Sequence, residues 1–502
     1  MENEKVEDVI IIHSMRPKNL FGQIKSFVDN QAEFVLEGRK ALIENMSRSE
    51  DIRKQIFLII SDNDDTSAVK DYNKEVEKTK GYIEKKGLGD KIRIDYWSFD
   101  RQNAFFDFVF SEFPEAKKTK VLLSDYNSKK FGGLRGAQNK GIIIADYISK
   151  DLGDNIIYHK LDDDIYSYLA SFKGGVLSFV QGYNVFGHKA ALLDMKGIRI
   201  IGSVYLIDSP SPLTDLKEGL DEILKLLEGI NDAQEGKIKD FLDYMSMIPD
   251  RIVDESGIIK KEGLFLKRGS SLEEVDELLS LLQKGKNRFW FQTIEGLSKN
   301  FFRFIDTLPG GFISFKKREK IFPFFNGSNQ DVIFSVLEHA REGGVHLDLP
   351  AGHIKSVSVR ESLLDSMKIG DDFGEKNNDF HTMNYILELA KKDRFKIGEG
   401  LPNNGFYGWR FHKLKPESSL DTAEKILELA KKINKNNTVK NISRFALSVK
   451  SNMEEMSKSF DYDKREVPES KKVAEFLYDT WKDSIKSFNN LREYVSSLKK
   501  DL

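Results

Sequence analysis

The chain of 502 residues contains no cysteine. Disulfide bonds, thiolate metal sites and cysteine nucleophiles are therefore excluded, so any chemistry must rest on oxygen and nitrogen atoms. An excess of charge of one sign is also missing, because 78 lysines and arginines stand against 80 aspartates and glutamates. The formal net charge of -2 gives no global positive field, and nucleic acid is not expected as the main partner.

Long apolar runs are absent from the sequence. The first residues, MENEKVEDVIIIHSM, combine an acidic lead with an apolar run much shorter than a signal-peptide core or a membrane span. No other window reaches that length, so we expect a cytoplasmic protein. The composition is that of an ordinary folded chain, with 40% hydrophobic and 31% charged residues. A chain of this length is expected to form two or three compact units.

The first part of the chain alternates short apolar runs with helical patterns. The helical patterns begin near Lys18, near Lys70 and near Gly136. Such alternation predicts βαβ units and an α/β fold with a mostly parallel sheet flanked by helices, in which ligands bind beyond the carboxyl ends of the strands. The runs expected to be strands read VIIIHS, IFLIIS, KIRIDYW, VLLSDY and NIIYHKL.

The pattern changes after residue 205. Leucines at three- and four-residue steps predict a helical insert over 206–285, strand-like text returns over 286–358, and 359–502 reads as a C-terminal helical region. The clearest helix of that last region is LDTAEKILELAKKINK. Its lysine-rich helices are most simply solvated, and the alternatives are an oligomer contact or a peripheral contact with an acidic membrane face.

Three consecutive aspartates, Asp162, Asp163 and Asp164, end the apolar run IIYHKL. Carboxylates at the carboxyl end of a strand suit a hard cation such as Mn²⁺ or Mg²⁺, whose coordination shell a bound diphosphate would complete. The alternative is a strand-to-helix turn that one of the aspartates caps.

The stretch FGGLRGAQNKGIIIADYISKDLGDNIIYHKLDDDI resembles the nucleotide-sugar half of the family 2 glycosyltransferases. That family has the GT-A (Rossmann-like) fold, and its pattern is a glycine pair, an Ala-Arg-Asn-like helix start and a strand ending in Asp-x-Asp. The segments IIIHSMRPKNLFGQ and IFLIISDNDDTS are similar to its first two strands. The resemblance implies a nucleotide-sugar site formed by His13, Ser14, Arg16, Asp62, Asp64, Arg135, Asn139, Asp162 and Asp163. Arg135 stands earlier than the pattern places its arginine.

The segment TLPGGFISFKKREKIFPFFNGSNQDVIF resembles the acceptor half of the same family. The resemblance implies that Asp331, at a helix start, is the general base that deprotonates the acceptor hydroxyl. The family usually has Glu-Asp at this place, and only the aspartate is present here. Acceptor contacts are implied for Gly310, Gly311, Asn329 and Gln330.

Further along, GVHLDLPAGHIKSV resembles the family segment that supplies a histidine to the metal. His353 holds the matching place, and His346 is the alternative. The implied ligands of Mn²⁺ or Mg²⁺ are therefore Asp162, Asp164 and His353.

The resemblance spans about residues 7–205 and 286–358 and implies a metal-dependent enzyme. The enzyme would transfer a sugar with inversion from a nucleoside-diphosphate sugar to the hydroxyl of a glycan, a lipid-linked molecule or a small molecule. Three alternatives stay open. A retaining GT-A enzyme would use Asp331 to position a small or phosphorylated acceptor, a nucleotidyltransferase would need a glycine-rich phosphate loop that HSMRPKN does not provide, and a noncatalytic protein would use its helices to bind partners.

Overall fold

The computed structural model describes the main α/β body and several further segments. The described residues are 7–29, 55–61, 66–123, 134–206 (without 154, 164, 174–175, 182–183 and 195–196), 220–232 and 439–454 in part, 258–260, 290–292, 302–303, 312–325, 330–341, 344–353, 382–397, 416–433 and 468–498.

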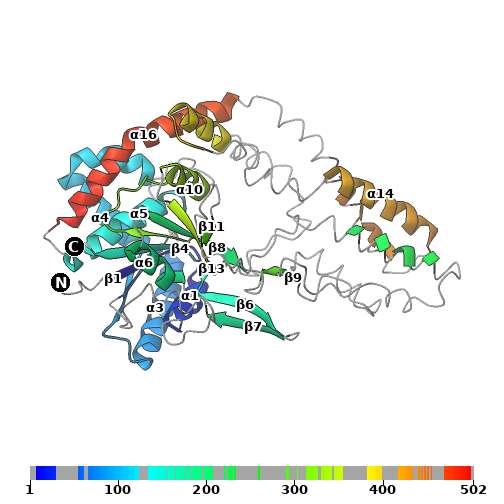
Figure 1. Cartoon of the computed structure of the whole chain (residues 1–502), viewed down its shortest axis with the longest axis horizontal. Coiled ribbons are helices and arrows are strands. Elements are labelled where there is room, and N and C mark those ends of the chain that lie inside the picture. The colour runs from blue at the N-terminus through cyan, green and yellow to red at the C-terminus, as the bar shows by residue number, and fades with distance from the viewer. Residues whose placement is uncertain are drawn as a thin grey trace.

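A mostly parallel β-sheet forms the centre of the body (Figure 1). Its strands lie in the order β11-β13-β8-β12-β4-β1-β2-β3, and β5 pairs with the end of β13. Six of these strands point in one direction, while β12 runs antiparallel between β4 and β8. The predicted α/β fold with a mostly parallel sheet and flanking helices is confirmed. The strand bounds are β1 Glu7–Ser14, β2 Gln55–Ser61, β3 Ile92–Trp97, β4 Ile156–Asp162, β5 Ile165–Tyr166, β8 Ile200–Leu206, β11 Phe302–Arg303, β12 Phe312–Lys316 and β13 Gly344–His353.

Helices cover both faces of the sheet, which is why its central strands read as continuous apolar runs. In β1, Val9 and Ile11 point to one face, whereas Ile10 and Ile12 point to the other. The first face packs against α4, α5, α10 and α16, and the second against α1, α3 and α6. The helix bounds are α1 Pro17–Asp29, α3 Thr66–Lys85, α4 Phe99–Glu112, α5 Leu134–Ile148, α6 Asn184–Asp194, α10 Gln330–Ala340 and α16 Pro468–Ser496.

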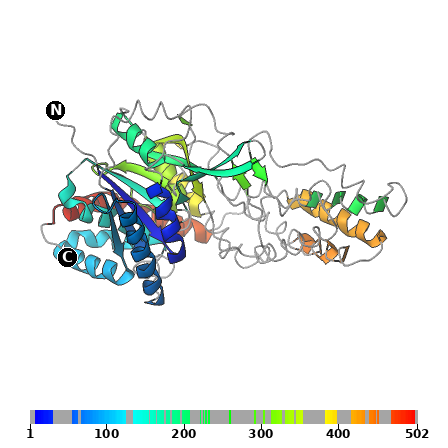
Figure 2. The ribbon, with the colours of Figure 1, turned by 90° about the horizontal axis from the view of Figure 1, so that it is seen from below.

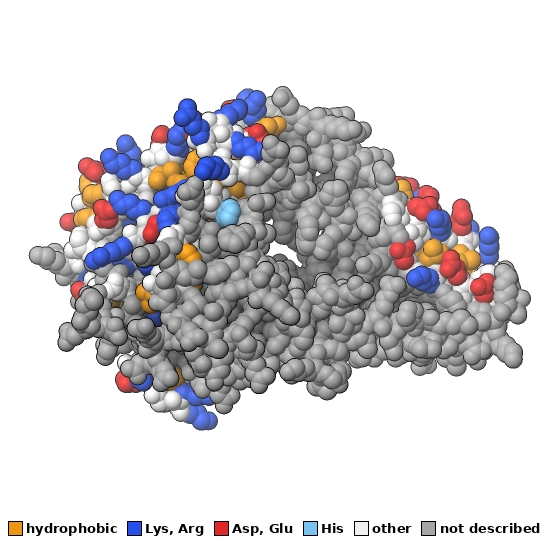
Figure 3. Space-filling model, in the orientation of Figure 1, with side chains coloured by type: hydrophobic (Ala, Val, Ile, Leu, Met, Phe, Trp, Pro, Cys, Tyr) orange, Lys and Arg blue, Asp and Glu red, His pale blue; other side chains and the backbone are white. Residues whose placement is uncertain are grey.

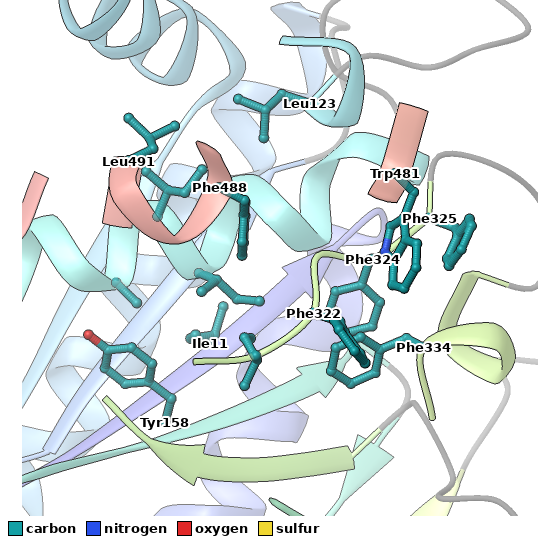
Figure 4. Packing of buried hydrophobic residues seen from close by; sticks show 14 of the residues in the cluster. Ile11, Leu123, Tyr158, Phe322, Phe324, Phe325, Phe334, Trp481, Phe488 and Leu491 are labelled. Carbon is teal, nitrogen blue, oxygen red and sulfur yellow. The ribbon is translucent and has the colours of Figure 1, made fainter. Parts of the chain in front are cut away.

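The last long helix, α16, belongs to the core of this body. Trp481, Phe488 and Leu491 are buried in the same cluster as residues of β1 and β4, as Figure 4 shows. The ring of Trp481 stacks on Phe325 at 4.6 Å between centroids, and its Nε1 donates to the carbonyl of Pro323 at 2.8 Å. These apolar side chains of α16 are therefore covered within the chain.

The segments predicted as a helical insert and as strands beyond it are described in part. Positions 220–232 are helical where described, and Asp221 accepts a 3.4 Å hydrogen bond from Thr422 in α14 (Pro416–Lys432). Strand β9 (Ile258–Lys260) pairs with β10 (Trp290–Gln292). Figures 1 and 2 both place α14 apart from the sheet. Figure 3 shows acidic and basic side chains intermixed over the region of α14, as on a solvated face.

No described helix is both long enough and apolar enough to cross a membrane.

The run VLLSDY was expected to be a strand, and this expectation is wrong for its first three residues. Positions 121–123 end the 3-10 helix η1 (Pro114–Leu123), whereas 124–126 lie outside the described residues. Leu122 and Leu123 are buried, and η1 packs against α5 and α16. A short apolar run can be buried as well under helices as in a sheet, and periodicity alone does not separate the two.

A buried ion pair lies at the start of β1 on the face covered by α6. Lys189 of α6 donates to Asp8 Oδ2 at 2.7 Å, and His159 Nε2 faces Asp8 Oδ1 at 3.6 Å. Burial alone would raise the pKa of Asp8, but Lys189 and His159 bring it down to about 2. His159 is fully buried, and burial lowers its pKa, although Asp8 opposes the shift.

The ion pair continues as a chain of hydrogen bonds through the core. Ser314 Oγ of β12 lies 2.7 Å from Nδ1 of both His159 and His188, and His188 Nε2 lies 2.7 Å from Ser203 Oγ. One direction of donation satisfies these bonds with both imidazoles neutral: Ser203 to His188, His188 to Ser314, and Ser314 to His159. The remaining Nε2–H of His159 then points at the Asp8 carboxylate. The strands β1, β4, β8 and β12 and the helix α6 are thus tied together without a net buried charge.

Candidate functional site

The carboxyl ends of β1 and β4 lie side by side at the switch point of the sheet, where the order of the strands reverses. From β1 the chain builds β2 and β3 on one side, and β4 then pairs with the opposite edge of β1. Loops leave such a point in opposite directions, and the crevice between them is where open α/β sheets bind ligands. The register pairs His13 with Asp162, so the carboxyl end of β1 and the aspartate triplet are neighbours.

Asp163 holds the turn after β1 in place. Its Oδ2 accepts hydrogen bonds from the backbone N–H groups of Met15 and Arg16 at 3.0 Å each, and the Arg16 guanidinium binds both carboxylate oxygens. The aspartate is 5% exposed. The predicted contact of Asp163 with a nucleotide is therefore corrected to a structural role, because its acceptor sites are directed at the protein. Arg16 is at the predicted place, and its guanidinium is ion-paired there.

Asp162 reaches solvent at the end of β4. Its side chain is 38% exposed, and Oδ1 accepts a 2.8 Å bond from the fully buried Lys160. Its backbone carbonyl accepts from Gln23 of α1 at 2.6 Å, and the same amide group also donates to the carbonyl of Ile165. Helix α1 is thereby fixed to the triplet.

His13 lies under α5 beside this carboxylate. It is 4% exposed, and neither ring nitrogen has a hydrogen-bond partner in the part of the chain that the structure describes. Burial lowers the pKa of His13 well below its usual value, and the charge of Lys160 lowers it further. The ring is therefore neutral near pH 7. Ser14, next in the strand, is fully buried, and its carbonyl accepts from Tyr72 at 2.7 Å.

Gly141 lets α5 approach His13 closely. A Cβ atom at this position would lie 2.6 Å from His13 Cε1 and 3.0 Å from Ile11 Cγ2. We expect Gly141→Ala to lower the free energy of unfolding by about 1–3 kcal/mol, because overpacking outweighs the helix propensity gained. Gly81 in α3 is the matched control, since a Cβ there meets nothing within 4 Å. Urea denaturation should show a loss for Gly141→Ala and no loss for Gly81→Ala; equal effects would contradict the steric explanation.

Asn139 has a structural role instead of the predicted nucleotide contact. It is fully buried; its amide donates to the carbonyls of Leu122 and Phe324, and its carbonyl oxygen accepts from the N–H of Phe324. These bonds at 2.8–3.0 Å use all of its donors and tie η1 to the segment after β12. Arg135 lies in the first turn of α5, and its side chain is outside the description.

The end of β13 comes back to the triplet through β5. His353 is the register partner of Ile165, and Gly352 that of Tyr166. Ile165 directly follows Asp164 in the chain. The backbone of His353 is thus beside the triplet, although its side chain is outside the description. His346 lies seven residues before His353 in β13 and pairs with Gly202 of β8, so it lies away from this edge.

Two of the predicted acceptor-side residues lie in α10. Gln330 and Asp331 form its first turn, and their side chains are outside the description. Helix α10 packs against β13, the strand that carries His353. The remaining predicted site residues, Asp62, Asp64, Asp164, Gly310, Gly311 and Asn329, lie outside the described residues.

Of the predicted metal ligands, Asp162 has a described side chain. Within the described side chains no three His, Asp or Glu groups are placed to hold a metal ion, but Asp164 and the imidazole of His353 are not among those side chains. Of the two aspartates of the triplet that the structure describes, Asp163 is directed inward and Asp162 reaches solvent. The oxygen of a carboxylate that reaches solvent, as in Asp162, is the type of ligand that Mn²⁺ or Mg²⁺ prefers.

Sequence reasoning overlooked Lys160, Gln23 and Tyr72, which bind the backbone or carboxylates of the site. Of these three residues, only Lys160 could have been identified from the sequence. A lysine inside the apolar run IIYHKL needs a polar or charged partner when the strand is buried.

Fold and site together define an α/β protein with carboxylates at the switch point of a mostly parallel sheet. No protein-family model matches the chain, and no curated protein sequence matches it. Its relation to the glycosyltransferases consequently rests on its own residues and stays a proposal.

Proposed function

We propose that this chain is a GT-A glycosyltransferase that transfers a sugar from a nucleoside-diphosphate sugar to an acceptor hydroxyl. The observation that carries the proposal is the juxtaposition at the switch point: His13 and the turn to Arg16, the aspartate triplet, and the backbone of His353 belong to segments far apart in sequence. These are the segments that the resemblance assigns to the donor and the metal. A ligand crevice is expected at this place in any sheet of this kind, so sequence pattern and topology support the same site.

Each residue has a role in the proposed reaction. Asp163 and Arg16 keep the turn after β1 rigid, so its backbone is preorganised for the donor. Asp162, Asp164 and His353 would hold Mn²⁺ or Mg²⁺. When bound, such an ion neutralises charge on the departing diphosphate.

Asp331 is the proposed general base. It lies in the first turn of a helix that packs against β13, and a carboxylate at that place can take the proton of the attacking hydroxyl. Attack from the face opposite the leaving group would invert the anomeric carbon. NMR of the product anomer separates this course from the retaining alternative.

The decisive experiment uses the full chain and a panel of nucleoside-diphosphate sugars with MnCl₂, MgCl₂ or EDTA. We expect one donor to raise the melting temperature only with a divalent ion, because a ligand that binds the folded state stabilises it. The same donor should release nucleoside diphosphate slowly to water and faster with an acceptor. In Asp164→Ala, release should fall by about 100-fold or more while the melting temperature without ligand stays unchanged.

Asp107→Ala is the control, because Asp107 is an exposed aspartate on α4. It should release nucleoside diphosphate at the wild-type rate. The proposal is refuted if no donor stabilises the chain with any metal, or if Asp164→Ala releases product at the rate of the control.

A further inference from the structure

One arginine has a backbone conformation that ordinarily belongs to glycine. Arg394 has a φ of 69°, and among the described residues no other residue except glycine has a positive φ. It ends the helix over 382–392 with a Schellman motif: the N–H of Phe395 donates to the carbonyl of Ala390 at 3.1 Å, and its own N–H donates to that of Lys391 at 2.9 Å. A side chain in this conformation makes the fold less stable than glycine would.

The end of α3 has the same motif with the usual residue. There Gly87 has a φ of 69°, its N–H donates to the carbonyl of Glu84 at 2.8 Å, and the N–H of Leu88 donates to that of Ile83 at 3.1 Å. Because the two helix ends share their hydrogen bonds and their φ, capping does not account for an arginine at position 394. The exposed side chain of Arg394 is the part that needs a reason.

Arg394 lies in a local excess of positive charge. The segments 316–320, 338–341 and 388–397, together with Arg199, contain ten lysines and arginines against four aspartates and glutamates, which leaves +6. The whole chain has a formal net charge of -2, so this excess is local. We call the exposed part of these segments the basic surface. In Figure 3, lysine and arginine side chains predominate over the upper part of the main body.

Ring contacts and ion pairs join these segments. The Phe322 ring, just after the first segment, lies 4.3 Å from the Arg341 guanidinium and 5.8 Å from the Phe395 ring, measured between ring centres in the second case. Arg199 is ion-paired with one glutamate of each of the first two segments. The basic surface is therefore assembled by the fold from parts of the chain that are far apart in sequence.

The carboxylates around Arg394 are already engaged. Glu388 pairs with Lys391 at 3.2 Å, and Asp393 pairs with a lysine of α16 at 2.5 Å. Lys392 and Arg394 are exposed and have no ion pair with any residue that the structure describes. A lysine in the last turn of a helix complements the helix dipole, which gives Lys392 a local role. Arg394 lies beyond the helix and has no such role.

We propose that the basic surface binds the anionic headgroups of a membrane, and that Arg394 stands at its helix end for this contact. Lysine and arginine bind phosphate groups through charge-assisted hydrogen bonds, and clusters of them bind anionic lipids. The exposed large apolar side chains of the described chain all lie elsewhere. The basic surface thus offers no exposed ring on which nucleic-acid bases could stack and none to insert between lipid tails. Binding to headgroups by charge alone fits it best.

The test is co-sedimentation of the full chain with phosphatidylcholine vesicles, with or without about 30% phosphatidylserine. We expect the wild type to bind the anionic vesicles alone and to be released by about 0.5 M NaCl. Arg394→Gly should bind them about fivefold more weakly, and Lys392→Gln combined with Arg394→Gly about 25-fold more weakly. Because glycine relieves the backbone, Arg394→Gly should also raise the melting temperature by about 1–3 °C. A purely structural arginine would not give weaker binding in a more stable protein.

Gly87→Arg is the matched control. It places an arginine at the same φ at the end of α3, which packs against the opposite face of the sheet. It should lower the melting temperature by a similar amount and leave vesicle binding unchanged. The double variant Arg394→Gly with Gly87→Arg keeps the net charge of the wild type, and it should still bind about fivefold more weakly.

The proposal is overturned if the wild type does not bind the anionic vesicles, or if Arg394→Gly binds them as tightly as the wild type. Heparin and duplex DNA are the comparison probes. Binding to either of them without binding to vesicles would assign the basic surface to another class of anionic partner and overturn the membrane contact. The inference does not rest on the proposed function, and release of nucleoside diphosphate by Arg394→Gly should equal that of the wild type.

Discussion

We expect Arg492→Met to lower the free energy of unfolding by about 3–5 kcal/mol, because it leaves a buried aspartate without its counter-ion. The guanidinium of Arg492 binds Asp146 of α5 through Nε at 2.7 Å and also donates to the carbonyls of Glu319 and Lys317 at 2.9 Å. Both charged side chains are at most 5% exposed. The bond thus joins α16 to α5 and to the segment after β12 through the interior.

The measurement is urea denaturation followed by circular dichroism. Lys486→Met is the control, since Lys486 is exposed on the same helix and its loss should change the free energy of unfolding by less than about 0.5 kcal/mol. In the double variant Asp146→Asn with Arg492→Met, part of the loss should be recovered, because the uncompensated charge is gone. A loss below about 1 kcal/mol in Arg492→Met would contradict the structural role of the Arg492–Asp146 ion pair.

The central strands were predictable because each is a run of β-branched residues buried on both faces. The prediction of the aspartates at the carboxyl edge followed from the same pattern, and the register of His13 with Asp162 agrees with it. The sequence pattern does not determine the direction in which each side chain points. Asp163 and Asp162 are adjacent in the chain, yet one is directed inward to Arg16 and the other reaches solvent.

A helix, a hairpin and the role of α16 were not predicted from the sequence. Helix α4 was not predicted, although Ser98 caps it by accepting from the N–H of Arg101 at 3.3 Å, and its buried phenylalanines lie on one face. The hairpin of β6 (Tyr168–Lys173) and β7 (Val176–Gln181) was also missed. The role of α16 could not be read from its sequence, because an amphipathic helix looks the same whether its own domain or a partner covers it.

His13 and His159 are buried and neutral in the fold, and lowering the pH should protonate them. Burial lowers the pKa of both His13 and His159 below the ordinary value of 6.5. In the unfolded chain each histidine takes up a proton near pH 6.5, whereas in the fold each stays neutral to lower pH. The stability that they contribute is therefore fully present above about pH 6.5 and is lost progressively as the pH falls toward their folded pKa values.

We therefore expect the free energy of unfolding to fall below pH 6.5 with a slope of up to about 2.7 kcal/mol per pH unit, one proton for each histidine. Urea denaturation at half-unit steps from pH 7.5 to 4.5 measures it. His13→Gln and His159→Gln should each reduce the slope by up to about 1.4 kcal/mol per pH unit, and His339→Gln, a half-buried histidine of α10, is the matched control. A flat profile between pH 7 and 5 would contradict the neutral hydrogen-bond chain through Ser314.

Asp8 makes the free energy of unfolding depend on pH in more acidic solution as well. Its pKa of about 2 lies below the ordinary value of 3.8, so its contribution is present above pH 3.8 and is lost as the pH falls toward 2. The two losses of stability begin at different pH, near 6.5 for the histidines and near 3.8 for Asp8. While Asp8 is ionised, it also remains the acceptor toward which His159 Nε2–H points. As the pH falls, the loss of stability from the histidines should therefore begin before the loss from the Asp8–Lys189 pair.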